Sequence, residues 1–278
     1  MIGEHRTDAV LSRVLVTGAG GAFGRAASAA LRDRGATVMG LDLNADPGAG
    51  VLECDITDPA AAARGVGEAV AALGGLDVLV NNAGLGGPAS AGAPPDQRAR
   101  QMVEVNLFGA WNITAAAIDD LVRERGRVVF VASRMSFLGL PLAASYAVSK
   151  RGLVAYADCV RAEYGTHVSV SCIHPAMVKT PIHDSTAAAG LSLDGVSSEE
   201  PLEGVVARIV EAALDPRPPR DAAVTRAGRV QLFVARHLPG VVDRVVARQV
   251  AKQVGAGAFD QAPLAEGLRD RHGRAPGR

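Results

Sequence analysis

Short apolar runs alternate along the chain with longer stretches that have helical spacing. The short runs are rich in Val, Leu and Ile and are bounded by turn-forming residues, which is typical of buried strands. The predicted strands are residues 13–17, 37–42, 51–55, 77–81, 127–132 and 168–174. The predicted helices are residues 22–34, 59–73, 96–123 and 144–164.

Strands that are apolar on both faces and separated by helices indicate a parallel sheet that is covered on both sides. The sequence therefore predicts an α/β fold: a single Rossmann-type, doubly wound parallel sheet with helices on both faces and a C-terminal helical extension. We expect residues 1–220 to form the dinucleotide-binding and catalytic domain and residues 221–278 to form the extension. Residues 180–198 lack periodicity and are expected to form a loop.

The extension is expected to contain a last strand at 222–225, helices at 229–237 and 241–254, and a weakly ordered tail from Gly255. One side of the second helix carries valines, at Val242, Val245, Val246 and Val250. Basic residues repeat on another side of it. Such a helix can lie on an anionic membrane surface, or it can pack against protein while its charges stay in solvent. Because large aromatic residues are scarce here, we expect packing against the domain or a partner subunit.

Composition excludes several classes of function. The formal net charge is +0 at pH 7, which gives no sign of a nucleic-acid partner. No apolar run approaches the length of about 18 residues that a membrane helix needs, and the N-terminus lacks a secretory pattern, so a cytoplasmic protein is expected. The cysteines Cys54, Cys159 and Cys172 lie far apart and the histidines show no ligand spacing, so no metal site is expected.

A glycine-rich turn directly follows the first predicted strand and precedes the first predicted helix. Residues 17–24 read Thr-Gly-Ala-Gly-Gly-Ala-Phe-Gly. Glycine is needed where the backbone turns tightly and approaches a pyrophosphate closely. The helix N-terminus behind it offers free N–H groups and a positive dipole end. This context favours a dinucleotide-binding cradle over a turn with no ligand.

Asp42 ends the second predicted strand, 24 residues after Gly18. A carboxylate at about this spacing can accept hydrogen bonds from the adenosine ribose hydroxyls, and it repels a 2′-phosphate. No Arg stands beside it in the sequence to compensate that charge. We therefore expect NAD to be preferred over NADP, although Asp is also common in turns without any ligand.

Tyr146 and Lys150 lie four residues apart in a predicted helix and therefore share one face. A free tyrosine is a poor base at neutral pH, and a nearby ammonium lowers its pKa. Alone, this pair would be expected on a solvated helix surface. However, Ser133 ends the fifth predicted strand, 13 residues before Tyr146, where open α/β sheets build their sites. Ser136 is a competing candidate for the same role.

These motifs together resemble the short-chain dehydrogenase/reductase family over residues 13–214. The family's cradle, T-G-x-x-x-G-x-G, is matched by Thr17, Gly18 and Gly24, whereas Ala22 stands at its middle glycine. The N-N-A-G motif is intact at residues 81–84. Residues 174–180 are similar to the family's P-G-x-x-x-T segment, with an alanine in place of its glycine.

The resemblance implies a set of site residues. The catalytic residues are expected to be Asn106, Ser133, Tyr146 and Lys150. The residues expected to bind the cofactor are Thr17, Gly18, Gly21, Phe23, Gly24, Asp42, Asp55, Ile56, Asn82, Ala83, Gly84, Tyr146, Lys150, Pro175, Val178 and Thr180. Asp55 is expected near the adenine ring while Asp58 caps the next helix, and His174 is expected to be a packed residue.

The implied roles follow the chemistry of each side chain. Tyr146 is the acid/base, Ser133 orients the substrate oxygen, and Lys150 lowers the tyrosine pKa and reaches the nicotinamide ribose. Asn106 holds a water of a proton relay. Thr180 contacts the nicotinamide carboxamide.

The expected function is that of an NAD(P)-dependent oxidoreductase that interconverts an alcohol and its ketone. Segments 85–88, 135–142 and 177–193 are expected to line the substrate pocket, and their few charges favour a hydrophobic secondary alcohol. One alternative is a non-catalytic nucleotide-sensing protein on the same fold. Another is an NAD-assisted epimerase or dehydratase. A homo-oligomer, dimer or tetramer, is expected.

Overall fold

The computed structural model describes residues 12–180, 182, 184–191, 199–260 and 262–273. Within these residues the sheet has seven parallel strands in the order β3-β2-β1-β4-β5-β6-β7. They are β1 (Arg13–Thr17), β2 (Thr37–Asp42), β3 (Val51–Glu53), β4 (Val78–Asn81), β5 (Arg127–Val131), β6 (Ser169–Ile173) and β7 (Asp221–Ala222). The order reverses between β1 and β4, which places a crevice at their carboxyl ends.

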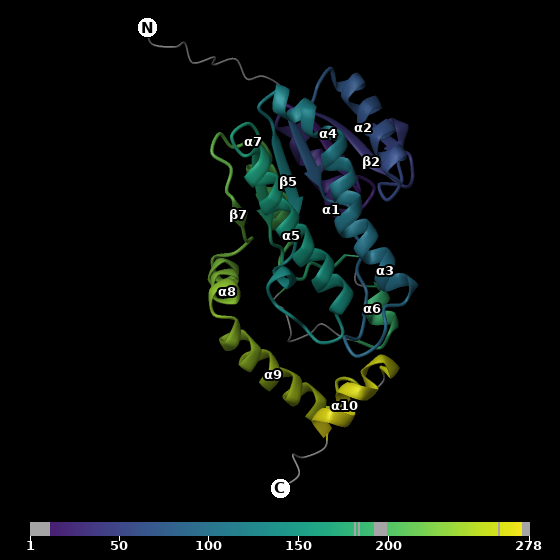
Figure 1. The fold of residues 1–278 in the computed structure, drawn as a ribbon, viewed down its shortest axis with the longest axis vertical. Coiled ribbons are helices and arrows are strands. Elements are labelled where there is room, and N and C mark those ends of the chain that lie inside the picture. Colours follow the sequence, from purple (N-terminus) through teal and green to yellow (C-terminus); the bar gives the residue numbers. More distant parts are fainter. Residues whose placement is uncertain (1–11, 181, 183, 192–198, 261, 274–278) are drawn as a thin grey trace.

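Helices cover both faces of the sheet (Figure 1). One face carries α2 (Pro59–Leu73), α4 (Ala110–Arg123) and α5 (Ala144–Tyr164), and the other carries α1 (Ala22–Asp33) and α7 (Leu202–Leu214). Successive strand residues supply the two cores, since Leu15 and Phe130 belong to the first and Val16 and Val129 to the second. The predicted α/β fold with a doubly wound parallel sheet is confirmed.

The predicted helix 96–123 contains a change of winding. It begins as α3 (Gln97–Val103), continues as a π-helical turn, η2 (Glu104–Gly109), and resumes as α4. The apolar spacing runs through all three segments, so the sequence predicts one helix. Such π-turns are rare and often lie at functional sites, and this one carries the fully buried Asn106.

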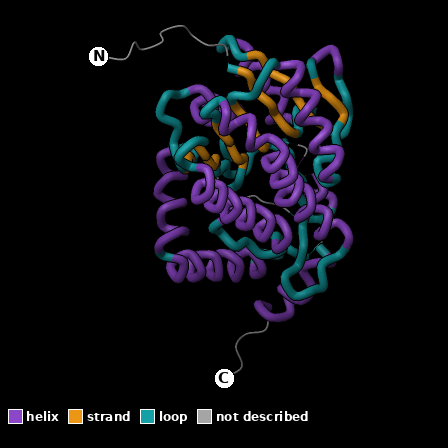
Figure 2. The backbone as a smooth tube through the Cα atoms, turned by 45° about the horizontal axis from the view of Figure 1, so that its top comes forward, coloured by secondary structure: helices purple, strands orange, loops and turns teal. Residues whose placement is uncertain are grey.

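The C-terminal extension continues as α8 (Arg226–His237), α9 (Pro239–Gly255) and α10 (Glu266–Gly273). Figure 2 shows the strands in the upper part of the molecule and the C-terminal helices along its lower edge. The expectation of a weakly ordered tail from Gly255 is wrong for its described residues. Phe259, Ala262 and Ala265 are buried in a small cluster with Leu191, which lies outside the extension. In the expected loop 180–198, α6 (Asp184–Ala188) forms, and residues 192–198 lie outside the described residues.

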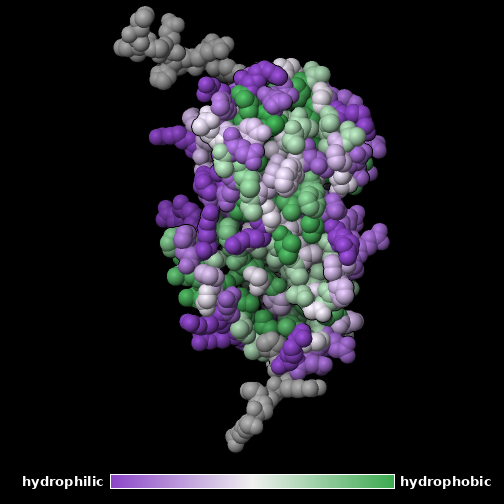
Figure 3. Space-filling model, viewed as in Figure 1, coloured by the Kyte–Doolittle hydropathy of each residue, from purple (hydrophilic) through white to green (hydrophobic). Residues whose placement is uncertain are grey.

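The apolar side of α8 and α9 packs only in part. Val250 is buried, whereas Val230, Phe233, Val241 and Val245 are exposed. Figure 3 shows apolar side chains gathered over the lower half of this face of the molecule. The expected packing against the domain therefore holds for the end of α9, and contact with a partner subunit stays a prediction. Among the described helices, none is both long and apolar enough to span a bilayer.

An ion pair joins β1 to the start of β4 at the end of the sheet opposite the crevice. The Arg13 guanidinium donates to both carboxylate oxygens of Asp77, with Nε–Oδ2 and Nη2–Oδ1 distances of 2.9 and 2.7 Å. It also pairs with Glu124 at 2.9 Å. Burial raises the pKa of Asp77, but the hydrogen bonds from Arg13 outweigh it, so the pKa of this carboxyl lies below its ordinary value. The paired, ionised Asp77 therefore stabilises the folded state.

We predict that Asp77→Asn lowers the free energy of unfolding by about 1–3 kcal/mol at pH 7, because Arg13 loses a charge-assisted partner. The folded-state pKa of Asp77 is depressed, so its contribution is complete above the unfolded pKa of about 3.9 and disappears as the pH falls through the folded value. Urea unfolding at a series of pH values checks this. The surface pair of Asp120 and Arg123 gives the control, since Asp120→Asn should change stability by less than about 1 kcal/mol. Equal effects of the two variants would contradict the assignment.

Candidate active site

A cavity of about 790 Å³ opens at the carboxyl ends of the central strands. Most of the predicted site residues line it: Gly18, Gly21, Phe23, Asp42, Asp55, Ile56, Asn82, Ala83, Gly84, Ser133, Tyr146, Lys150, Pro175, Val178 and Thr180. Thr17, Gly24 and Asn106 are predicted site residues that lie behind this lining. The structure thus brings the predicted cofactor residues and the predicted catalytic residues to one cavity.

The glycine-rich turn approaches the backbone after β4 very closely. Gly18 has a φ of 64°, and a Cβ added there would lie 2.7 Å from Ala83 Cα. A Cβ at Gly24 would lie 2.1 Å from the carbonyl oxygen of Gly18. Both positions therefore require glycine. By contrast Ala22 keeps its methyl group at the first position of α1, partly exposed beside the cavity.

Hydrogen bonds hold this turn to the N-N-A-G segment. The Thr17 hydroxyl oxygen accepts from the backbone N–H groups of Asn82 and Ala83, at 3.0 and 3.1 Å. The Asn82 side-chain amide donates back to the carbonyl oxygens of Thr17 and Gly18, at 2.9 and 3.2 Å. These hydrogen bonds hold the glycine turn and the segment after β4 against each other.

Acidic side chains lie at the ends of β2 and β3. Asp42 accepts a hydrogen bond from the backbone N–H of Gly20 at 2.9 Å, so its carboxylate faces the glycine turn. Asp55 accepts from the Thr57 N–H and hydroxyl at 2.9 and 2.7 Å, and Asp58 caps α2 through the Ala60 N–H. The predicted cap at Asp58 is confirmed. Arg25 also lines the cavity, and sequence reasoning overlooked it because it considered only the neighbours of Asp42.

Ser133, Tyr146 and Lys150 meet on one wall of the cavity. Ser133 lies two residues after the end of β5. It is 7% exposed, and its side chain hydrogen-bonds to the Tyr146 side chain. The Lys150 ammonium donates to the Val131 carbonyl at 2.8 Å and lies 5.9 Å from the Tyr146 ring centroid. The competing Ser136 is buried and does not line the cavity. The geometry therefore favours Ser133 over Ser136.

Burial shifts the pKa values of Tyr146 and Lys150 in opposite directions. It raises the pKa of Tyr146, and the hydrogen bond from Ser133 lowers it only in part. Burial also lowers the pKa of Lys150 to about 8. The Lys150 side chain donates to the Val131 carbonyl, and this hydrogen bond favours its charged form. The role of Lys150 in lowering the tyrosine pKa stays a prediction.

Asn106 is anchored inside the protein. Its Oδ1 accepts from the Leu85 N–H at 2.7 Å, and its Nδ2 donates to the Leu85 carbonyl and to Ser149 Oγ at 2.9 and 3.0 Å. It thus ties the π-turn to the cavity edge and to the helix of Tyr146. The role of Asn106 in a proton relay stays a prediction.

A buried polar network behind Ser133 has no signal in the sequence. His174 is fully buried, with Nε2 2.9 Å from Asp221 Oδ1 and Nδ1 3.3 Å from the Ser133 carbonyl oxygen. This placement agrees with its prediction as a packed residue. The carboxylate of Glu200, 3% exposed, accepts from the Ala176 N–H at 2.8 Å and opposes the buried Arg134.

Backbone hydrogen bonds accompany this network beside the wall formed by Ser133, Tyr146 and Lys150, which we call the reaction wall. The Arg134 N–H donates to the Pro175 carbonyl at 2.9 Å, and the Glu200 N–H donates to the Met177 carbonyl at 2.8 Å. The partners are distant in the chain, so no local pattern could have revealed them. Among the described residues, no cluster of His, Cys, Asp or Glu is arranged to hold a metal ion.

A strand-order reversal and a glycine turn that leads into a helix lie beside Ser133, Tyr146 and Lys150 at one cavity. This is the arrangement of a Rossmann-type α/β protein with a dinucleotide site. The family model of the short chain dehydrogenases matches residues 12–189. The chain belongs to the short-chain dehydrogenase family.

Curated relatives agree with this family. The chain is 36% identical over 214 residues to a 1-deoxy-11-beta-hydroxypentalenate dehydrogenase of Streptomyces exfoliatus, covering 69% of this chain and 77% of that protein. It is 31% identical over 206 residues to the bovine dehydrogenase/reductase SDR family member 7B, covering 72% of this chain but only 63% of that protein. An L-fucose dehydrogenase of Bos taurus is 31% identical over 191 residues, covering 63% of this chain and 69% of that protein.

Solved structures share the fold. A short chain dehydrogenase from Burkholderia cenocepacia, solved with NADP, has a TM-score of 0.72 at 23% identity and covers 85% of this chain and 98% of that chain. One from Mycobacterium paratuberculosis, solved with NAD, has a TM-score of 0.69 at 22% identity and covers 78% of this chain and 97% of that chain.

We predict that Gly24→Ala weakens NADH binding at least about tenfold, equivalent to ~1.4 kcal/mol, because the added methyl group displaces the Gly18 carbonyl. Fluorescence titration with NADH checks the affinity, and thermal unfolding checks the fold. Gly67→Ala in α2 is the control, since a Cβ there meets nothing within 4 Å. Unchanged NADH affinity in Gly24→Ala would show that the turn is not the cradle.

Proposed function

We propose that this protein is an NAD(P)-dependent oxidoreductase that interconverts a secondary alcohol and its ketone, with Tyr146 as the acid/base. The observation that carries the proposal is the shared cavity: Ser133, Tyr146 and Lys150 on one wall and the glycine cradle at another. Two relatives are named as dehydrogenases of hydroxylated compounds, which agrees with this reaction class.

The residues present fit a dinucleotide. The test is steric: the tight turn before α1 forms only with glycine at positions 18 and 24, because a Cβ there would meet the backbone of Ala83 or of Gly18. We propose that Thr17, Gly21 and Phe23 join them around the pyrophosphate, that Asp42, Asp55 and Ile56 surround the adenosine, and that residues 82–84, Pro175, Val178 and Thr180 surround the nicotinamide end. A bound nicotinamide supplies the hydride donor or acceptor, and its oxidised form brings a positive charge.

The protein's own groups handle the proton. During alcohol oxidation the Tyr146 oxygen removes the hydroxyl proton, and during ketone reduction it returns a proton to the carbonyl oxygen. Ser133 donates a hydrogen bond that favours the phenolate form of Tyr146 and orients the substrate oxygen. Since burial alone raises the tyrosine pKa, the phenolate depends on positive charge nearby, and Lys150 is the buried cation that supplies it.

Several finer properties belong to the same proposal. The Asp42 carboxylate, held against the Gly20 N–H, favours NAD over NADP. Phe108, Trp111 and Val148 are exposed on one side of η2, α4 and α5, which supports a homo-oligomer formed through that side. A cytoplasmic location and a division of the chain at residue 220 stay predictions.

Tyr146→Phe should keep the fold and NADH affinity but lower kcat by at least about 10²-fold, since general acid–base catalysis contributes about 10²–10⁴-fold. Steady-state oxidation of a panel of secondary alcohols, followed by NADH absorbance, measures this. Tyr164→Phe, at the other end of the same helix, is the control and should retain wild-type turnover. If Tyr146→Phe kept more than about a tenth of the wild-type rate, Tyr146 would not be the acid/base.

Asp42→Ala should narrow the preference for NAD over NADP in kcat/KM by at least about tenfold, because the carboxylate no longer repels the 2′-phosphate. Glu53→Ala removes an exposed carboxylate from the end of the neighbouring strand β3 and should leave the ratio unchanged. A comparison of kcat/KM for NADP between Arg25→Ala and the wild type shows whether Arg25, a basic residue of the cavity lining, assists the use of NADP. Equal use of NAD and NADP by the wild type would overturn the preference.

A further inference from the structure

A second, smaller cavity of about 70 Å³ continues from the dinucleotide cavity past Tyr146. Both cavities are lined by Met135, Leu140 and Tyr146. The acid/base therefore stands where the two spaces join. A substrate whose reacting carbon lies at Tyr146 has one of its substituents directed into the smaller cavity.

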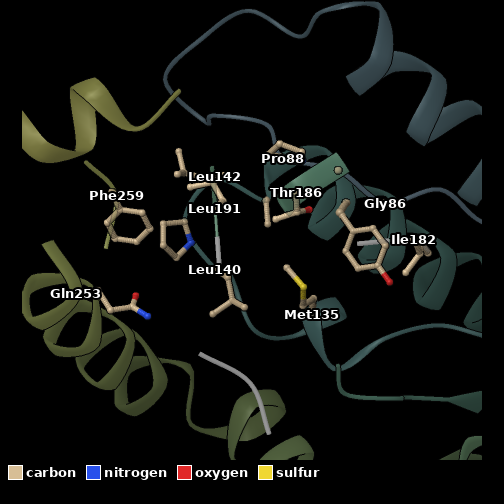
Figure 4. A pocket seen from close by; sticks show the side chains of 14 residues that line it. Gly86, Pro88, Met135, Leu140, Leu142, Ile182, Thr186, Leu191, Gln253 and Phe259 are labelled. Atoms are coloured by element: carbon tan, nitrogen blue, oxygen red, sulfur yellow. The ribbon is translucent and has the colours of Figure 1, made fainter. Parts of the chain in front are cut away.

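The smaller cavity is apolar. Its described lining consists mainly of aliphatic and aromatic carbon, for example at Met135, Leu142, Ile182 and Phe259, and includes no Asp, Glu, Lys or Arg side chain (Figure 4). Burying a charge without a partner is very costly, and burying a polar group without one is costly too. The cavity thus selects an uncharged, apolar substituent.

The C-terminal extension builds the far wall. Figure 4 shows Phe259 and Gln253 at one end of the pocket, with Ile182 at the other. Phe259 is 6% exposed and packs in the cluster with Leu191 and Leu142. This wall comes from residues beyond β7, the last strand of the sheet.

The backbone at Leu142 gives an independent sign of a built site. Leu142 has a φ of 59°, in the left-handed region that a bulky residue rarely adopts. Its carbonyl accepts from the Ala89 N–H at 2.8 Å, and its side chain packs beside Phe259. Such strain persists only where surrounding contacts enforce it, and it is concentrated at ligand sites. Here the enforced conformation directs Leu142 to the pocket lining.

The volume limits the size of the substituent. A cavity of about 150 Å³ lined by Leu, Ile and Phe binds benzene, so a cavity of about 70 Å³ has room for about half as many atoms, about three non-hydrogen atoms. A propyl group matches that space.

We propose that the substrate is an uncharged ketone or secondary alcohol bearing one apolar substituent of about three non-hydrogen atoms, and that Phe259 of the extension limits its length. This proposal rests on the proposed function, because it names the substrate class of the same site. Phe259 acts by shape, as a specificity-determining residue.

The test is a series of methyl ketones, from propanone to 2-undecanone and including acetophenone, reduced with NADH. The wild-type kcat/KM should rise about fourfold per methylene until the substituent has about three carbons, and then fall. Phe259→Ala should move the optimum to chains longer by about two or more carbons. Phe233→Ala, on the exposed side of α8, is the matched control and should leave the optimum unchanged.

A binding measurement separates this proposal from the catalytic one. Calorimetric titration of 2-pentanone and 2-heptanone into the Tyr146→Phe protein, with and without NADH, measures binding in the pocket without turnover. If Phe259→Ala weakens the binding of 2-pentanone and strengthens that of 2-heptanone, the proposal is supported even where no ketone is reduced. Phe259→Leu keeps an apolar residue in the cluster and serves where Phe259→Ala does not fold.

Two results would overturn the pocket assignment while leaving the reaction class intact. One is Tyr146-dependent turnover with no dependence on chain length. The other is an identical shift of the optimum in Phe259→Ala and Phe233→Ala. Conversely, length-dependent binding together with equal turnover by wild type and Tyr146→Phe would overturn the catalytic proposal alone.

Discussion

The close contact between Gly18 and the backbone after β4 is the constraint on which the site depends. A single methyl group at Gly18 would meet Ala83 Cα at 2.7 Å, so the glycine turn and the N-N-A-G segment share one packed surface. Gly84, in the same segment, lies close to Asn106 and Lys150. A Cβ added at Gly84 would be 3.2 Å from Asn106 Oδ1 and 3.4 Å from Lys150 Nζ. Residues 82–84 therefore connect the glycine turn to the wall that holds Lys150.

Tyr146 and Lys150 lie together on the reaction wall, where desolvation disfavours the charged form of each. Burial raises the pKa of Tyr146 and lowers that of Lys150 to about 8, so the protein alone favours a neutral phenol and weakens the hold of the amine on its proton. Ser133 and the Val131 carbonyl provide the compensating hydrogen bonds. Small changes of charge in the cavity therefore have large effects on the tyrosine, because the local environment screens them poorly.

The sheet and the cavity residues could be predicted because their signals are local. Buried parallel strands read as uninterrupted apolar runs. The residues of the glycine turn lie next to one another in the sequence, and Tyr146 and Lys150 are only four positions apart. The π-turn at Glu104–Gly109 could not be predicted, since the apolar spacing continues through it. The partners of Glu200 and His174 depend on contacts across distant parts of the chain. The order of the tail after Gly255 could not be predicted, because its few apolar residues pack against Leu191, which lies outside the extension.

The C-terminal helices meet the rest of the molecule at two separate places. At the back, Gln231 accepts from Arg134, and Arg236 pairs with Asp221, which in turn holds His174 against the Ser133 carbonyl. At the front, Phe259 and Gln253 line the apolar pocket. Val230 and Phe233 of α8 and Val241 and Val245 of α9 belong to neither place and are exposed.

The back contacts are polar and directional, so they fix how α8 lies against the rest of the molecule and hence the course of α9. The front contacts are apolar and undirected, so a residue there can change size without breaking a hydrogen bond. The length limit proposed at Phe259 is therefore separate from the contacts that hold Ser133.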